Sequence, residues 1–227
     1  MKRRAAPLLI LLALAAACQQ PSAAIAGESA VNSPAAVRRA NEPAGLKTAI
    51  FAGGCFWGVE GVFSHVKGVT SAVSGFHGGS GKTAKYDRVK QGDTGHAEVV
   101  EVTYDPRVVR YDQLLRIYFS VIADPTQLNR QGPDTGTQYR TALVPLTEEQ
   151  RLVASAYIAQ LRASGVWKRP IVTRMEGLDR FYPAEAEHQD FMAANPRHPY
   201  IVTWDVAKVR SLKKLFPALY KPQFTKG

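Results

Sequence analysis

The chain has 227 residues, of which 45% are hydrophobic and 21% are charged, values typical of one globular domain with an extension. A formal net charge of +10 would suggest an anionic partner if the basic residues were clustered, but they are spread along the chain. No helix-turn-helix, zinc-finger or RNA-binding motif accompanies the charge, so no nucleic-acid partner is expected. The cysteines and histidines lack zinc-ligand spacing, so no metal site is expected either.

Residues 1–17 have the pattern of a secretory signal peptide. Three basic residues, Lys2 to Arg4, precede an apolar run that ends at Ala17. This run is shorter than the roughly 20 apolar residues that span a bilayer. Cys18 follows three alanines, as in a bacterial lipobox, which predicts lipidation of Cys18 and a membrane anchor. Cleavage after Ala26 by an ordinary signal peptidase is the alternative, and both predict an extracytoplasmic protein in the periplasm or cell envelope.

Residues 18–45 are rich in Ala, Ser, Pro, Asn and Gly and show no apolar periodicity, which predicts a flexible tether without a fold. Residues 46–227 are then expected to form the catalytic domain. A basic and apolar pattern in residues 202–227 predicts a packed amphipathic helix near the end of the chain.

Hydrophobic periodicity predicts the following elements in chain order: strand 47–53, helix 57–66, strands 69–76 and 97–104, helix 112–122, strand 139–146, helix 147–163 with Thr147 as its N-cap, and strand 171–176. This order predicts an α/β (α+β) fold, a two-layer sandwich of ferredoxin-like type with helices on one sheet face. Long loops are expected to carry function, and the C-terminal region is expected to be irregular.

Cys55 stands at the predicted turn from the first strand into the first helix. A lone cysteine is most often a small buried hydrophobe. Here Gly53 and Gly54 permit a sharp turn, and the N–H groups and dipole of the following helix should favour the reactive thiolate. Phe56 and Trp57 follow directly, either as core aromatics or as an apolar pocket beside the sulfur.

The segment GGCFWGVE at residues 53–60 resembles the signature of the peptide methionine sulfoxide reductase A family. The resemblance extends from about Lys47 to at least Asn195. Further blocks appear in the family's order, among them SGFHGG at 74–79, TGHAEVV at 94–100, DPTQ at 124–127, GTQYR at 136–140 and FYPAE at 181–185.

The resemblance implies the activity of a peptide-methionine (S)-S-oxide reductase acting on oxidised proteins or free methionine sulfoxide. It implies that Cys55 attacks the sulfoxide sulfur and is left as a sulfenic acid. The roles implied for the other residues are proton donation by Glu98, Tyr86 and Tyr139, contact with the substrate methyl by Phe56 and Trp57, and substrate positioning by Asp134, with Tyr182 near the site.

Glu98 also shows a pattern of its own. In the predicted strand it shares a face with Val100 and Val102, so apolar surroundings should raise its pKa and keep it protonated. From the strand pattern alone, one inward acid is more often an ion-pair partner than a functional group. Glu101 points to the opposite face and should be an ordinary surface carboxylate.

The sequence departs from the family in its cysteines, because none follows Cys55. An internal recycling disulfide is therefore not expected, and no cofactor is expected to be bound. An external dithiol such as thioredoxin should reduce Cys55, and the enzyme is expected to be a monomer.

Two other functions remain open from the residues alone. One is a cysteine hydrolase or acyltransferase in which His77, His96 or His188 is the base. The other is a lipid-tethered binding module that uses the aromatic pocket without catalysis. A disulfide oxidoreductase is disfavoured because the chain has no Cys-x-x-Cys motif.

Overall fold

The computed structural model describes residues 30–227. The signal peptide, Cys18 and the first part of the expected tether lie outside these residues, so their assignments stay predictions. Within the described part, no helix has the length and apolar character needed to cross a membrane.

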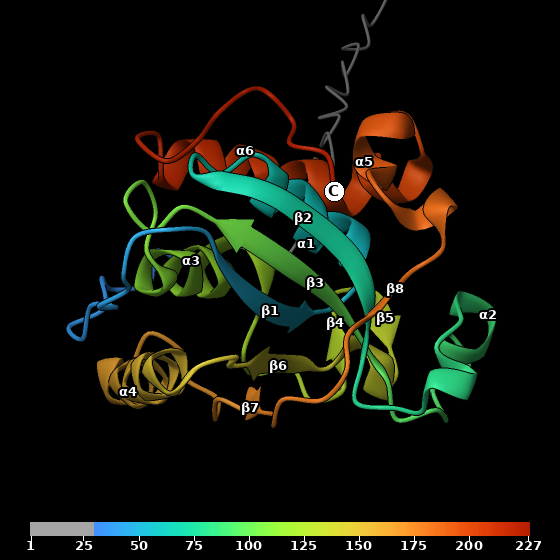
Figure 1. Cartoon of the computed structure of the whole chain (residues 1–227), viewed down its shortest axis with the longest axis horizontal. Coiled ribbons are helices and arrows are strands. Elements are labelled where there is room, and N and C mark those ends of the chain that lie inside the picture. The colour runs from blue at the N-terminus through green and yellow to red at the C-terminus, as the bar shows by residue number, and fades with distance from the viewer. Residues whose placement is uncertain (1–29) are drawn as a thin grey trace, which may run out of the picture.

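A six-stranded sheet forms the centre of the domain (Figure 1). Its order is β7-β6-β1-β3-β2-β8, and every neighbouring pair is antiparallel except β6 and β7. The strands are β1 (Lys47–Gly53), β2 (Val69–His77), β3 (Ala97–Tyr104), β6 (Thr141–Val144), β7 (Arg174–Met175) and β8 (Tyr182–Pro183). A separate hairpin joins β4 (Arg130–Gln131) to β5 (Asp134–Thr135).

Six α-helices accompany the strands in the described residues. They are α1 (Phe56–Ser64), α2 (Tyr86–Val89), α3 (Tyr111–Ile117), α4 (Glu148–Ser164), α5 (Phe191–Ala194) and α6 (Val206–Leu215). The side chain of Thr147 caps α4 by accepting the N–H of Gln150, as the sequence predicts. Gly165 ends α4 in the left-handed conformation.

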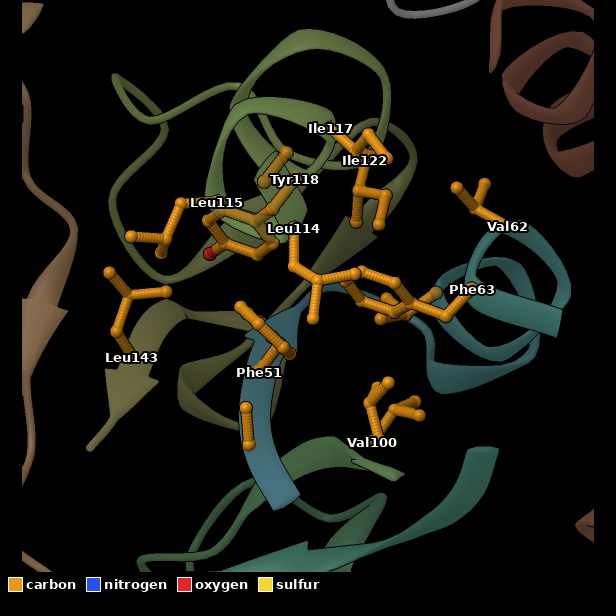
Figure 2. Packing of buried hydrophobic residues seen from close by; sticks show 14 of the residues in the cluster. Phe51, Val62, Phe63, Val100, Leu114, Leu115, Ile117, Tyr118, Ile122 and Leu143 are labelled. Carbon is orange, nitrogen blue, oxygen red and sulfur yellow. The ribbon is translucent and has the colours of Figure 1, made fainter. Parts of the chain in front are cut away.

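The main core lies between one face of the sheet and α1, α3, α4 and α6. Phe51 of β1 occupies its centre (Figure 2). Its ring lies 4.8 Å from that of Phe63 in α1 and 5.7 Å from that of Tyr118 after α3. A smaller cluster that includes Ile50 and Val99 covers the opposite face. Side chains alternate along β1, so that Phe51 lies in the main core and Ile50 in the smaller cluster.

Several predicted elements differ from the observed ones. The helix predicted at 112–122 is α-helical only to Ile117, the end of α3, and residues 118–122 form a π-helical segment. Tyr139 lies in a 3₁₀ turn before β6 rather than in the strand, and the strand expected at 171–176 keeps only two residues, in β7. The sequence does not predict the short elements α2, α5, β4, β5 and β8.

The expected flexible tether is wrong for residues 30–45, which pack on the domain. The N–H of Val31 donates to the carbonyl of Ser120, and the N–H of Ala40 donates to the Asp112 carboxylate. Ser33 is fully buried. The sequence does not reveal these contacts, because they are hydrogen bonds of backbone groups. Such bonds need no periodic apolar face, which is the pattern that predicts packing.

Candidate active site

Cys55 occupies the N-cap position of α1, directly after the end of β1, as predicted. Gly54 before it has φ +87°, and a Cβ at that position would lie 2.5 Å from Cβ of Gln131. Only glycine fits both the conformation and the space. The Cys55 side chain is thereby held in the interior, with the residue only 9% exposed.

Burial dominates the electrostatics of Cys55. It raises the pKa of the thiol well above its usual value, and the negative charges of Glu98, Asp205 and Asp134 raise it further. The N–H of Trp57 acts in the opposite direction but is the weaker effect. The expectation that the helix start would favour the thiolate in the empty site is therefore wrong, because desolvation outweighs one turn of helix dipole.

Glu98 reaches the site from β3 and is 1% exposed. Its Oε2 accepts a hydrogen bond from the N–H of Phe56 at 3.0 Å, so it lies beside the residue that follows Cys55. Burial raises the pKa of the carboxyl to about 8 and is only partly opposed by that hydrogen bond. Glu98 is thus a protonated acid at neutral pH, as its strand face predicts.

Glu101, on the opposite face of β3, is not the ordinary surface carboxylate that was expected. It is partly buried, and burial raises its pKa. Among the described residues, the Glu101 side chain forms no hydrogen bond with a residue of the Cys55 site. A substitution of Glu101 is therefore a useful control for the same substitution of Glu98.

Tyr86 and Tyr139 both face the same site. Burial raises the pKa of Tyr86 to about 12 and also raises the pKa of Tyr139, and the charges of Glu98 and Cys55 add to both shifts. Both phenols therefore stay protonated and can donate hydrogen bonds. The start of α2 is fixed by the Glu185 carboxylate, which accepts the N–H of Tyr86 at 3.2 Å.

The sequence left open whether Phe56 and Trp57 are core aromatics or line a pocket beside the sulfur, and the two residues differ in this respect. Phe56 is fully buried and packs against Phe76 and Tyr86, with ring centroids 5.8 and 6.2 Å away. Trp57 is only partly buried, and its indole stacks on Phe191 at 3.7 Å. Phe56 therefore supports the site from the core, whereas Trp57 offers surface to a bound group.

Asp134 lies on β5, and the Tyr200 hydroxyl donates to its Oδ2. Burial raises the Asp134 pKa, while the hydrogen bond from Tyr200 and the charge of Lys208 lower it. The charge of Asp134 raises the pKa of Cys55, and Tyr200 is the hydrogen-bond partner of Asp134.

Tyr200, Asp205 and Lys208 also belong to the site, although the sequence does not predict them as site residues. Asp205 is fully buried and lies 3.5 Å from the Lys208 ammonium. A Cβ on Gly58 in the first turns of α1 would lie 2.1 Å from Oδ1 of Asp205. A glycine inside a helix signals such a close approach, but it does not reveal which residue approaches.

Tyr182 lies in β8, an edge strand of the sheet. It pairs with Phe76 in the sheet, and its ring lies edge-on to His96 at 5.7 Å. The guanidinium of Arg180 covers it at 5.5 Å. Through these contacts Tyr182 packs at the edge of the sheet.

The three candidate histidine bases have other partners. His96 Nε2 pairs with the carbonyl of Ser80 at 3.0 Å, and the ring of His188 lies 4.0 Å from that of Tyr86. Burial lowers the pKa of His77, and Glu176 and Asp179 are the charged groups that oppose this most, with a further hydrogen bond to the backbone of Gly177. The charges that act on Cys55 are carboxylates, so the pattern of a cysteine hydrolase is not formed.

The candidate active site is identified by the residues around Cys55 and not by a large cavity. A cavity of about 790 Å³ is lined by Phe119, Trp167 and Trp204 among others and does not include Cys55. Residues 30–227 also contain no group of three or more His, Cys, Asp or Glu side chains arranged to hold a metal.

A buried thiol beside a protonated carboxylic acid and two phenols defines a thiol-dependent enzyme that can protonate an oxygen while sulfur attacks. Residues 47–218 match the family model described as peptide methionine sulfoxide reductase, and the chain belongs to that family.

The relatives agree with the family model. The chain is 58% identical to peptide methionine sulfoxide reductase MsrA 2 of Mesorhizobium japonicum, over 78% of this chain and 90% of the relative. It is 49% identical to MsrA 2 of Synechocystis sp., over 79% and 84%. The crystal structure of reduced Mxr1 from Saccharomyces cerevisiae is similar at 32% identity and a TM-score of 0.60, covering 71% of this chain and 92% of that chain.

These findings confirm the resemblance and the activity that it implies. The protein is a peptide-methionine (S)-S-oxide reductase of the A family with a mixed α/β fold. The hydrolase, acyltransferase and non-catalytic alternatives are accordingly set aside.

Proposed function

We propose that Cys55 carries out the reduction as nucleophile. Its thiolate sulfur attacks the sulfoxide sulfur and forms an S–S bond, and protonation of the oxygen lets the S–O bond break with loss of water. Water then attacks the Cys55 sulfur, the S–S bond breaks, and methionine leaves with Cys55 as sulfenic acid. The net result is transfer of one oxygen from the substrate to Cys55, and the two electrons that reduce the sulfoxide come from the cysteine sulfur. The observation that carries this proposal is the joint burial of Cys55 and the protonated Glu98, whose Oε2 accepts the N–H of Phe56, the residue after Cys55.

Glu98 is the proposed proton donor, with Tyr86 and Tyr139 as hydrogen-bond donors to the same oxygen. A sulfoxide oxygen leaves only when protonated, so the site needs neutral donors. The raised pKa values of all three groups support this role. The carboxylate that forms on Glu98 keeps the N–H of Phe56 as its partner.

The substrate is proposed to lie between Trp57 and Asp134. The exposed surface of the indole suits the sulfoxide methyl, and Phe56 supports it from the core. Asp134, oriented by Tyr200, is proposed to position the substrate. Tyr182 is a weaker candidate, because its contacts place it at the sheet edge.

Regeneration is proposed to use an external thiol. Cys55 is the free cysteine of the described residues. A dithiol partner, such as a thioredoxin-like protein, attacks the sulfenic sulfur with loss of water, and its second thiol then releases Cys55 as the partner becomes a disulfide. A dimedone-type trap after a single turnover without reductant should add one label to Cys55, read by intact mass. A disulfide between Cys18 and Cys55 in protein isolated from cells would contradict this scheme.

We also propose export as a monomer, with a lipid anchor at Cys18 in the periplasm or cell envelope. The leader and the three alanines before Cys18 support this location. Mass spectrometry of membrane-derived protein should show acylated Cys18 at the N-terminus, whereas a soluble form beginning at Gly27 would favour ordinary cleavage.

We propose that the fold is a sandwich of ferredoxin-like type. The order of the four inner strands, β6-β1-β3-β2, supports this classification.

The decisive experiment compares the two epimers of a methionine sulfoxide peptide. The purified domain is incubated with each epimer and a dithiol, and the methionine formed is measured. Reduction of the S epimer alone is expected, because the pocket presents sulfur to Cys55 only when oxygen meets Glu98. Comparable turnover of the R epimer would contradict the proposed geometry.

A further inference from the structure

A second buried acid, Glu60, lies on α1 one helical turn after Trp57. It is fully buried, and burial raises the pKa of its carboxyl to about 8. The proposed mechanism gives it no part. Its Oε1 accepts a hydrogen bond from the N–H of Asp190 at 3.2 Å, so Glu60 ties the helix of the nucleophile to the start of α5.

Asp190 has a backbone conformation that needs support. Its φ is +52°, in the left-handed region that residues other than glycine rarely adopt. Two hydrogen bonds hold it there. Glu60 accepts its N–H, and its own Oδ1 accepts the N–H of Gly227 at 3.1 Å. This conformation sets the direction in which the chain enters α5, and so it places the next residue, Phe191.

Phe191 in turn fixes Trp57. The two rings are nearly parallel, with an interplanar angle of 7° and centroids 3.7 Å apart. Phe191 therefore covers one face of the indole, and Tyr200 meets the ring edge-on at 5.9 Å. The orientation of the surface that Trp57 leaves to a ligand depends on where Phe191 stands.

We propose that Glu60 is a positioning residue for substrate recognition, which holds the Asp190–Phe191 turn and through it the indole of Trp57. The inference rests on the proposed contact of Trp57 with the substrate. Trp57 and Glu60 are three residues apart on α1, so one helix face carries both the contacting ring and the anchor of the ring that packs on it.

The test is a split between KM and kcat for an S-sulfoxide peptide with dithiothreitol as reductant. Glu60→Leu removes the acceptor at similar volume and should raise KM about 5- to 10-fold with kcat within about twofold of the unsubstituted enzyme. Glu60→Gln keeps an acceptor oxygen and should restore KM. Glu101→Leu on the outer face of β3 is the matched control and should leave KM unchanged.

A double substitution decides whether Glu60 acts through Phe191. Phe191→Leu alone should raise KM as Glu60→Leu does, and the pair together should raise it no further, because both act on one ring. Additive effects, an unchanged KM in Glu60→Leu, or a loss confined to kcat would overturn the proposal.

Asp190→Ala gives the same decision if Glu60→Leu does not fold. It disfavours the left-handed conformation while Glu60 stays, and its KM should rise, whereas an unchanged KM would overturn the proposal. These outcomes concern Glu60 alone. Failure of the proposed function would appear differently, as sulfoxide reduction that persists without the Cys55 thiol.

Discussion

The two walls of the Cys55 site come from parts of the chain with very different backbones. One wall, here called the strand-helix wall, consists of Cys55, Phe56, Trp57 and Glu98, on or beside α1 and β3. The other, the loop wall, consists of Asp134, Tyr200 and Asp205, from a short hairpin and a π-helical segment that begins after Tyr200. Regular elements hold the groups proposed to react, while irregular segments supply the charges and hydrogen bonds that orient them.

The strand-helix wall should show the largest effect of any substitution. Cys55→Ser should lower kcat about 10³-fold or more, because a hydroxyl is a far weaker nucleophile toward sulfur than a thiolate. Methionine formed from the S-sulfoxide peptide is the measure. Retention of a tenth of the activity would show that the reaction does not pass through this sulfur.

Glu98→Gln should follow, with a loss of about 10²-fold in the chemical step for removal of a general acid. The Glu98 pKa is raised to about 8, and the protonated form is the donor. Activity should therefore hold below about pH 8 and fall above it, and single-turnover rates of Glu98→Gln should lack that alkaline limb.

Glu101→Gln is the control for this prediction, on the same strand but the opposite face. It should change the rate little and leave the alkaline limb in place. Its partial burial makes it a stricter control than a fully exposed acid. Equal losses in the two variants would refute the assignment of Glu98.

The same contrast explains how far the sequence predicts the structure. The bounds of β1 and β3 are predicted correctly, and the burial of Glu98 follows from alternation along β3. Strand β8 has only two residues, one of them a proline, and such a segment carries no periodicity. The sequence could not predict the partners of Asp134 and Gly58 either, because distant segments meet them through side-chain contacts rather than through local patterns.

Within the strand-helix wall, the direction of the Cys55 pKa shift is the property that the sequence predicts wrongly. The helix start is visible in the sequence, but the depth of burial and the carboxylates of the loop wall are not. Desolvation depends on everything packed around the sulfur, including segments whose position only the fold reveals.

Tyr200→Phe tests the loop wall with a smaller expected effect. It removes the hydroxyl that donates to Asp134, which should lower kcat/KM about 10-fold, as for a hydrogen bond to a charged group. Tyr220→Phe is the matched control, since its ring stacks on His65 away from the site. Steady-state kinetics with the S-sulfoxide peptide compare the two, and equal losses would remove Tyr200 from the site.

The smallest effect is expected from Asp205→Asn, measured on the thiol itself. The groups that face Cys55 are the carboxyls of Glu98, Asp134 and Asp205 and the phenols of Tyr86, Tyr139 and Tyr200. Lys208 is the cation paired with Asp205. Removing the Asp205 charge lowers the Cys55 pKa and leaves the Lys208 charge less compensated, and both changes favour the thiolate.

The rate of Cys55 alkylation by iodoacetamide reports that change, because only the thiolate reacts. At a fixed pH below the thiol pKa, Asp205→Asn should react on the order of 3- to 10-fold faster than the unsubstituted enzyme. Asp105→Asn, which removes a carboxylate paired with Arg107 at the surface, should not change the rate. A simple loss of packing would expose Cys55 at every pH, whereas a charge effect shifts the pH profile and leaves the plateau at high pH unchanged. Faster alkylation with an unshifted profile would therefore assign Asp205 to packing alone, and the loop wall would then influence Cys55 only through Asp134.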